Sequence, residues 1–136
     1  MILLDSSGLL AALDEGEPDH EATMAILDAA RGPLLVIDFV LAEVDYLVLQ
    51  RLGAKAEADF LSQLTGGAFV REPVTASDLE RARAIAEAYA DQAIGLTNAS
   101  MMAVAERLAG CQVLTLDRRH FAPFRDRRGR PLRLLP

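Results

Sequence analysis

Three short apolar runs that each end at an aspartate constrain the fold of this chain more than any other feature. These runs are Ile2–Leu4 before Asp5, Leu34–Ile37 before Asp38, and Val113–Leu116 before Asp117. Uninterrupted apolar runs of this length are typical of strands buried on both faces, as in parallel sheets. Two weaker strand candidates cover residues 68–70 and 132–135.

Helical patterns lie between these runs. Apolar side chains recur at helical spacing over residues 39–51, 55–64, 76–89 and 99–108. We expect Asp38 to cap the first of these helices, Gly53 to end it, and Thr97 or Asn98 to cap the last. Because parallel strands need crossover connections that are usually helical, the order of elements predicts a three-layer α/β/α sandwich around a mostly parallel sheet.

The composition fits one soluble domain spanning residues 1–136. About half of the 136 residues are hydrophobic, which is enough for a single core. Cys111 is the one cysteine, so no disulfide can form within the chain and a reducing compartment is expected. The first residues carry no basic secretory signal, and no apolar run approaches the ~18 residues of a membrane span. We therefore expect a cytoplasmic protein without membrane contact.

The formal net charge is −6, which argues against a general nucleic-acid binder. Its distribution softens that objection, because seven of the fourteen basic residues follow Asp117 and all seven are arginines, whose planar forks suit phosphate. The alternative interpretation is a solvated tail that keeps the protein soluble. Within this segment, residues 125–130 are either disordered or a hairpin turn.

In open α/β sheets the working crevice lies beyond the carboxyl ends of the strands. This rule selects Asp5, Glu43, Asn98 and Asp117. The three carboxylates among them repel each other unless a cation sits between them. Hard oxygen ligands suit Mg²⁺ or Mn²⁺, and such an ion can assist water attack on a phosphodiester. Either Glu43 or Asp117 would hold or deprotonate that water.

Other acids and other site types are weaker candidates. Asp45 is expected to face solvent or an interface, and Asp91 to lie in a turn. Zinc is disfavoured because His20, expected at the surface, and His120 have no ligand partner at metal-binding spacing. A phospho-receiver domain would need a well-placed lysine, a haloacid-type phosphatase a second aspartate at Ser7, and a Rossmann module a glycine-rich turn; the chain supplies none of them.

Four stretches, taken in order and spacing, resemble the PIN-domain family and within it the VapC-type toxins of bacterial toxin–antitoxin pairs. Each stretch alone is a weak signal, but together they cover nearly the whole chain. They are Ile2–Leu10, Leu41–Leu47, Gly95–Ser100 and Leu114–Phe121.

The resemblance implies an endoribonuclease that uses Mg²⁺ or Mn²⁺, forms a homodimer and is neutralised by a cognate antitoxin of the VapB type. Carried over by position, Asp5, Glu43 and Asp117 match three acidic residues of the family, and Ser7 and Thr115 match hydroxyl positions that help to order the site. On this interpretation the arginines next to Asp117 are candidate RNA contacts; they are Arg118 and Arg119.

Asn98 departs from the family pattern, which normally has an aspartate at this position. An amide oxygen can still coordinate a metal ion, but it is neutral and accepts no proton. We therefore expect weaker metal binding and slower catalysis, with an unchanged fold. The alternative is a crippled PIN-like domain that acts by binding RNA or by sequestering its antitoxin.

Overall fold

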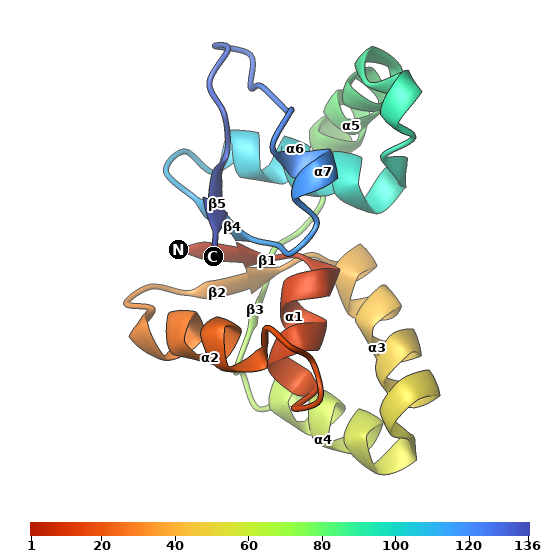
Figure 1. Cartoon of the computed structure of the whole chain (residues 1–136). Coiled ribbons are helices and arrows are strands. Elements are labelled where there is room, and N and C mark those ends of the chain that lie inside the picture. Colours follow the sequence, from red (N-terminus) through yellow and green to blue (C-terminus); the bar gives the residue numbers. More distant parts are fainter.

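A computed structural model describes residues 1–136, which fold around one five-stranded sheet. All strands are parallel and lie in the order β3-β2-β1-β4-β5. Figure 1 shows this sheet nearly on edge, with helices on both sides. The predicted α/β/α sandwich is therefore confirmed. The strand bounds are β1 (Ile2–Leu4), β2 (Leu34–Val36), β3 (Val70–Arg71), β4 (Gln112–Leu114) and β5 (Arg133–Leu135).

Two groups of helices cover the two faces of the sheet (Figure 1). The lower group is α1 (Ser6–Leu13), α2 (His20–Ala29), α3 (Asp38–Leu52) and α4 (Ala54–Thr65). The upper group is α5 (Ala76–Ala88), the 3₁₀ turn η1 (Ala90–Gln92), α6 (Gly95–Arg107) and α7 (Arg118–Phe121). The helical periodicity did not predict α1, because that helix is largely buried and lacks the polar stripe that periodicity detects.

Gly8 allows α1 to lie directly against β4. A Cβ atom at this position would stand 2.8 Å from the carbonyl oxygen of Leu114 and 2.9 Å from its Cγ. Such distances are shorter than van der Waals contact, so a larger residue would push the helix off the strand. This close approach brings the start of α1 next to the carboxyl end of β4.

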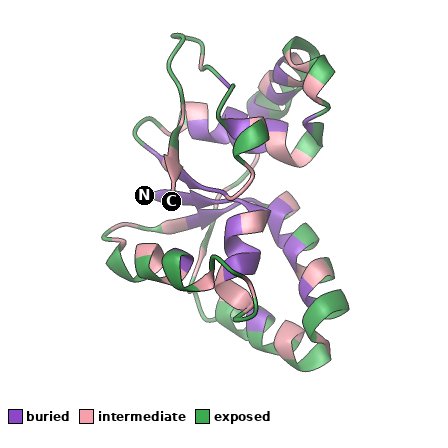
Figure 2. Ribbon diagram, in the orientation of Figure 1, coloured by how far each residue is buried: buried purple, intermediate pink, exposed green.

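The core runs through the sheet and the inner faces of the helices (Figure 2). All three residues of β1 are buried, as are Val113 and Leu114 of β4. Phe60, Phe121 and Phe124 are the largest fully buried side chains, and burial of such apolar surface is the main force that holds the layers together. None of the helices is both long and apolar enough to cross a membrane.

Two predicted helix caps are wrong. Asp38 is the first residue of α3 and caps nothing; its two carboxylate oxygens each accept a 2.8 Å hydrogen bond from Arg71. That pairing arises because β2 and β3 are neighbours and end side by side. Helix α6 begins at Gly95, so Thr97 and Asn98 lie inside its first turn rather than ahead of it.

The structure also tests the predictions for residues 125–130 and for His20. Residues 125–131 form a turn closed by a bridge between Arg125 and Pro131, and the backbone N–H groups of Arg128 and Arg130 both donate to Asp126 at 2.8 Å. The hairpin alternative is therefore confirmed. His20 is only half exposed, and its Nδ1 lies 2.8 Å from the carbonyl oxygen of Ala11, so its expected surface position is only partly correct.

Candidate active site

The carboxyl ends of β1 and β4 meet at the centre of the sheet. The strands pair in register, and the N–H of Asp5 donates to the carbonyl oxygen of Leu114 at 3.0 Å. Asp5 therefore lies beside the segment that carries Thr115 and Asp117, although more than a hundred residues separate them in sequence. The topology thus brings the first and the last of the predicted acids to one place.

Two hydroxyl groups hold the Asp5 carboxylate. Ser7 Oγ and Thr115 Oγ1 both donate to Asp5 Oδ2, each at 2.8 Å. A hydroxyl has a single proton to give, so both groups are then left as acceptors. Ser7 Oγ accepts the N–H of Leu116 at 2.9 Å, and Thr115 Oγ1 accepts the N–H of Asp117 at 3.0 Å. These bonds fix the backbone of Asp117 relative to Asp5.

The other two acids attach to the edge of this network. Glu43, on the second turn of α3, accepts a 2.6 Å hydrogen bond from Ser6 Oγ, and Ser6 follows Asp5 directly. Asp117 Oδ2 lies 2.6 Å from Nδ1 of His120, one turn further along α7. Because an ionised carboxylate only accepts, Nδ1 of His120 carries the proton in this contact.

Asp5 is a desolvated carboxylate without a cationic partner. Only 4% of the residue is exposed, and no lysine or arginine forms an ion pair with it. Burial raises the pKa of Asp5, and the hydrogen bonds from Ser7 and Thr115 offset this only in part. A carboxylate in this state gains free energy from any positive charge that reaches it.

The sequence model of the PIN-domain family matches residues 2–126. Ribonuclease VapC26 of Mycobacterium tuberculosis is 39% identical over 135 residues, which cover 99% of this chain and 100% of that protein. The chain belongs to the PIN-domain family. Within that family its similarity is to VapC-type proteins.

Solved VapC and VapBC structures share this architecture. Mycobacterium tuberculosis VapC20, described as a toxin that cleaves the sarcin–ricin loop, superposes with a TM-score of 0.75 at 19% identity, covering 83% of this chain and 87% of that one. VapBC2 from Rickettsia felis, bound to a fragment of its promoter DNA, has a TM-score of 0.65 at 15% identity and covers 99% and 98%. At these identities the likeness concerns the fold alone.

Asn98 lies outside the hydrogen-bonded network that joins the three acids. It is the fourth residue of α6 and half buried, and its side chain forms no hydrogen bond with Asp5, Glu43 or Asp117. The structure therefore links three of the four predicted positions through hydroxyl side chains and leaves the fourth unlinked.

The donors of this PIN domain suit a hard cation in kind, but they are not gathered around one point. No three carboxylate, imidazole or thiol side chains of residues 1–136 lie close enough together to hold a metal ion. Glu43 is engaged by Ser6 and Asp117 by His120. A metal ion bound to Asp5 would have to compete with Ser6 for Glu43 and with His120 for Asp117.

Two contacts of the site were absent from the predicted set. Ser6 was not singled out, although its place between two predicted site residues, Asp5 and Ser7, was a signal. His120 was considered as a zinc ligand and rejected, and its three-residue spacing from Asp117 on a helix was the signal that places the two side chains together. Of the predicted RNA contacts, Arg119 is largely exposed with its Nε 3.7 Å from Asp117 Oδ1, and Arg118 donates to the carbonyl oxygen of Pro136.

Proposed function

We propose that this protein is a divalent-metal-dependent endoribonuclease that acts as the toxin of a toxin–antitoxin pair. The observation that carries the proposal is Asp5, a buried carboxylate with a raised pKa and no cationic partner, tied through hydroxyl groups to Asp117 and adjacent to the Ser6–Glu43 pair. The 39% sequence identity between this chain and a protein named a ribonuclease supports RNA as the substrate.

A divalent cation, when bound, would supply charge stabilisation at the phosphodiester and make water a better nucleophile. Asp5 would be its innermost ligand, with Glu43 and Asp117 as the outer acids. Mg²⁺ and Mn²⁺ fit such oxygen donors, which include no thiolate.

The residues of the chain itself position and accept protons. Ser7 and Thr115 both donate to one oxygen of Asp5, so they fix the plane of that carboxylate and leave Oδ1 without a side-chain hydrogen bond. Glu43 or Asp117 takes the proton of the attacking water, because both are exposed enough to reach it. His120 holds the orientation of Asp117 through their 2.6 Å contact.

Asn98 makes this chain an attenuated enzyme in our proposal. Asparagine lacks the charge with which an aspartate would help to balance a cation, and it forms no bond to the present network. A second candidate function follows from the same residue: a domain that binds RNA without cleaving it. A cleavage assay separates the two.

The test compares the wild type with Asn98→Asp on a fluorescently labelled RNA, with Mg²⁺ or Mn²⁺ titrated against a chelator. We expect cleavage only with metal, and a rate roughly tenfold higher for Asn98→Asp, in the range that metal-site partners contribute. Equal rates would show that position 98 is dispensable. If neither protein cleaves RNA at any metal concentration, the ribonuclease proposal is wrong, and RNA binding without cleavage would support the second candidate.

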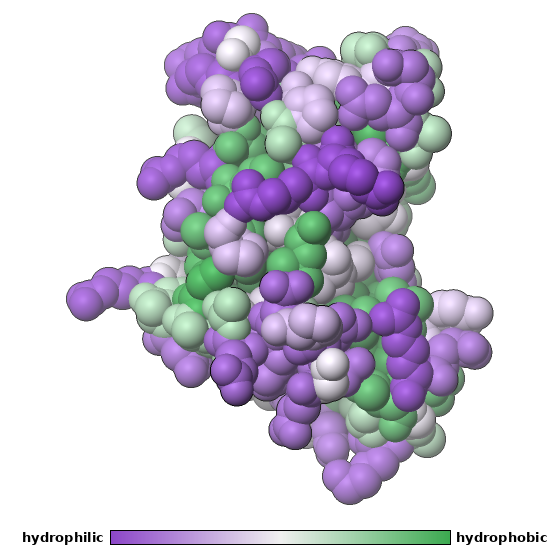
Figure 3. Space-filling view, in the orientation of Figure 1, coloured by the Kyte–Doolittle hydropathy of each residue, from purple (hydrophilic) through white to green (hydrophobic).

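We also propose that the protein forms a homodimer and binds a VapB-like antitoxin. The outward face of α3 supports the dimer, because Ala42, Tyr46 and Leu49 recur on it at helical spacing and Tyr46 is 62% exposed. Leu52 of α3 and Leu61 of α4 are also exposed. Figure 3 shows apolar atoms at the surface at its lower right, over α3 and α4. The solved VapBC complex from Rickettsia felis supports the antitoxin.

Light scattering tests the dimer. Tyr46→Asp should shift the protein towards the monomer mass, whereas Leu79→Asp, on the exposed face of α5, should not. A wild type that already has the mass of a monomer would contradict the proposal. Co-expression with a candidate antitoxin, followed by co-purification, tests the second partner.

A further inference from the structure

A second, oppositely charged region lies at the amino ends of β4 and β5. Two adjoining hollows of about 290 Å³ and 330 Å³ open between the end of α6, the turn after it and the turn at residues 126–130. Both are bordered by Glu106, Ala109, Asp126 and Arg130. Five arginines line the combined hollow, which we name the arginine hollow: Arg107, Arg127, Arg128, Arg130 and Arg133.

The two acids of the arginine hollow are already paired. Asp126 accepts hydrogen bonds from the Arg130 side chain and from two backbone N–H groups, and Glu106 lies 2.9 Å from Arg81 and 3.1 Å from Arg127. Hydrogen bonding to the Arg130 backbone, joined by its guanidinium, lowers the pKa of Asp126, so this acid stays ionised. The carboxylates of the hollow therefore neutralise only part of its positive charge.

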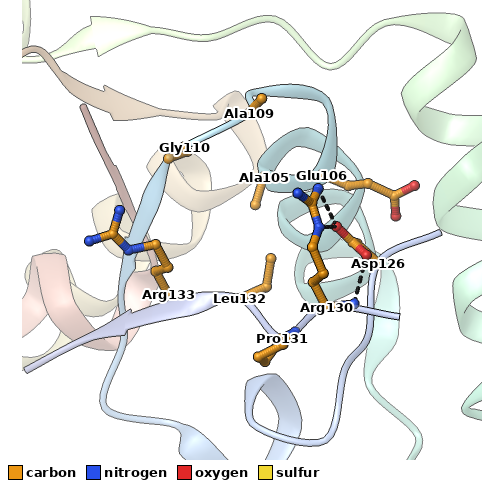
Figure 4. Close-up of a pocket in the computed structure, with 10 residues that line it drawn as sticks. Ala105, Glu106, Ala109, Gly110, Asp126, Arg130, Pro131, Leu132 and Arg133 are labelled. Carbon is orange, nitrogen blue, oxygen red and sulfur yellow. Dashed lines mark hydrogen bonds and ion pairs between the residues drawn. The ribbon is translucent and has the colours of Figure 1, made fainter. Parts of the chain in front are cut away.

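Two arginines of the hollow have no acidic partner. Arg128 and Arg133 are exposed and form no ion pair. Figure 4 shows Arg130 directed at Asp126, whereas the guanidinium of Arg133 stands on the other side of the hollow with no partner drawn. Each free guanidinium presents a planar fork that matches a phosphate.

The arginine hollow belongs to the one basic stretch of an otherwise acidic chain. Residues 1–117 carry 19 acidic and 7 basic side chains, a net charge of −12, whereas residues 118–136 carry seven arginines and one acid, a net charge of +6. A polyanion is repelled by the first part and attracted by the second. The basic stretch starts at α7, beside Asp117, and reaches the hollow through the turn at residues 126–130.

The hollow and the candidate active site lie at opposite ends of the same strand. Cys111 borders the hollow just before β4, and Thr115 holds Asp5 just after it. Four residues of extended chain span about 13 Å. A single nucleic-acid strand of several nucleotides can bridge that distance.

We propose that the arginine hollow binds backbone phosphates of single-stranded RNA outside the cleavage point, so that the enzyme holds its substrate at two places. This inference rests on the proposed function, since it takes RNA as the ligand. An acidic peptide is the other anion that arginines attract. RNA is favoured because the basic stretch is continuous from the candidate active site to the hollow.

The test measures binding of a fluorescein-labelled 20-nucleotide oligouridylate by anisotropy at several salt concentrations. Arg128→Ala combined with Arg133→Ala should weaken binding roughly tenfold and lower the slope of log affinity against log salt by about 1.4, because each lost phosphate contact on a single strand removes about 0.7. Cleavage of a dinucleotide by the same variant, in the Asn98→Asp background, should be unchanged, since its single phosphodiester is the cleavage point and leaves no second phosphate for the hollow.

Arg31→Ala is the matched control, because Arg31 is also exposed and free of ion pairs but lies before β2. A double variant that binds the 20-mer as the control does would overturn the proposal. Unchanged RNA binding with lost affinity for polyglutamate would overturn it in favour of an acidic protein partner. Failure of the proposed function has a different signature: no RNA is cleaved, while the arginine variants still change the binding slope.

Discussion

Asp5 and Asp78 are aspartates with the same low solvent exposure but with pKa shifts in opposite directions. Each is 4% exposed. Asp5 contacts neutral hydroxyl groups, and burial raises its pKa. Burial also disfavours the charged form of Asp78, but hydrogen bonds from Arg107 and Thr75 outweigh it and lower the pKa. The two acids differ in their partners, because a guanidinium contacts Asp78 and the only side-chain groups that hydrogen-bond to the carboxylate of Asp5 are hydroxyl groups.

This contrast separates a structural acid, Asp78, from the acid that we propose as a metal ligand, Asp5. Asp78 closes a capping box with Thr75 at the start of α5, and through Arg107 it ties that helix to the end of α6. Asp5 lies at the carboxyl end of β1 with its charge uncompensated. Asp78, which joins two helices, has a guanidinium as its partner. Asp5 has no cationic side chain as a partner, so its charge is available to a ligand.

The largest expected effect comes from Asp5→Asn. This nearly isosteric change removes the charge, so RNA cleavage should fall roughly 100-fold or more, the scale on which charged catalytic groups act. Because a raised pKa marks an ionised form that the fold disfavours, the thermal midpoint at pH 7 should stay the same or rise. An active variant, or one that melts well below the wild type, would show that Asp5 is a structural acid as Asp78 is.

Asp78→Asn should have the reverse profile. We expect a loss of about 2 kcal/mol in the free energy of unfolding at pH 7, below the roughly 3–5 kcal/mol for fully buried pairs because Arg107 is partly exposed and keeps Glu72. The folded pKa lies below the unfolded one, so this stability is present above the unfolded pKa and disappears as the pH falls through the folded value. Urea denaturation at pH 7 and pH 3 measures it, and a pH-independent loss would contradict the explanation.

Thr115→Val tests the hydroxyl link between Asp5 and Asp117. Loss of its two hydrogen bonds should reduce cleavage about tenfold, as outer-shell partners of metal sites do, and cost about 1 kcal/mol of stability. Thr23→Val is the matched control, because Thr23 is equally buried and its hydroxyl has no partner. Equal effects of the two variants would show that burial, and not the link, is what matters.

The smallest effect is expected at the surface pair of Asp38 and Arg71. Two hydrogen bonds join these side chains, but they are 58% and 65% exposed, and solvent screens such pairs to about 1 kcal/mol or less. Arg71→Ala should therefore change the urea midpoint only slightly, and the remaining change should shrink in high salt. A loss as large as that of Asp78→Asn would mean that ion-pair geometry outweighs exposure.

The strand pattern predicted the centre of the site because a strand end is a local feature of sequence. Ile2–Leu4 is apolar, so Asp5 could be placed at a strand end without a structure. Asp117 was also placed at a strand end, but β4 ends at Leu114, three residues earlier. The register that lets Thr115 reach Asp5 was not predictable from local pattern, because it depends on strand pairing across 110 residues. Arg71 likewise reaches Asp38 only through the pairing of β2 and β3.

Helix starts were the least predictable parts of the fold. Asp38 has the residue type of a cap, yet a guanidinium from the neighbouring strand binds it instead of the backbone. Helix α1 was missed because burial on nearly all sides erases the alternation of polar and apolar residues. In both cases tertiary packing overrode the local preference.

The central position of β1 in the sheet determines when the site is complete during protein synthesis. The first strand made is flanked by β2 and by β4, and Thr115, which orients Asp5, is translated 110 residues after it. At ~5–20 residues per second, a ribosome needs roughly 5 to 20 s to cover that interval. A chain whose translation stops before β4 therefore lacks the hydrogen bonds that join Asp5 to Asp117 through Thr115.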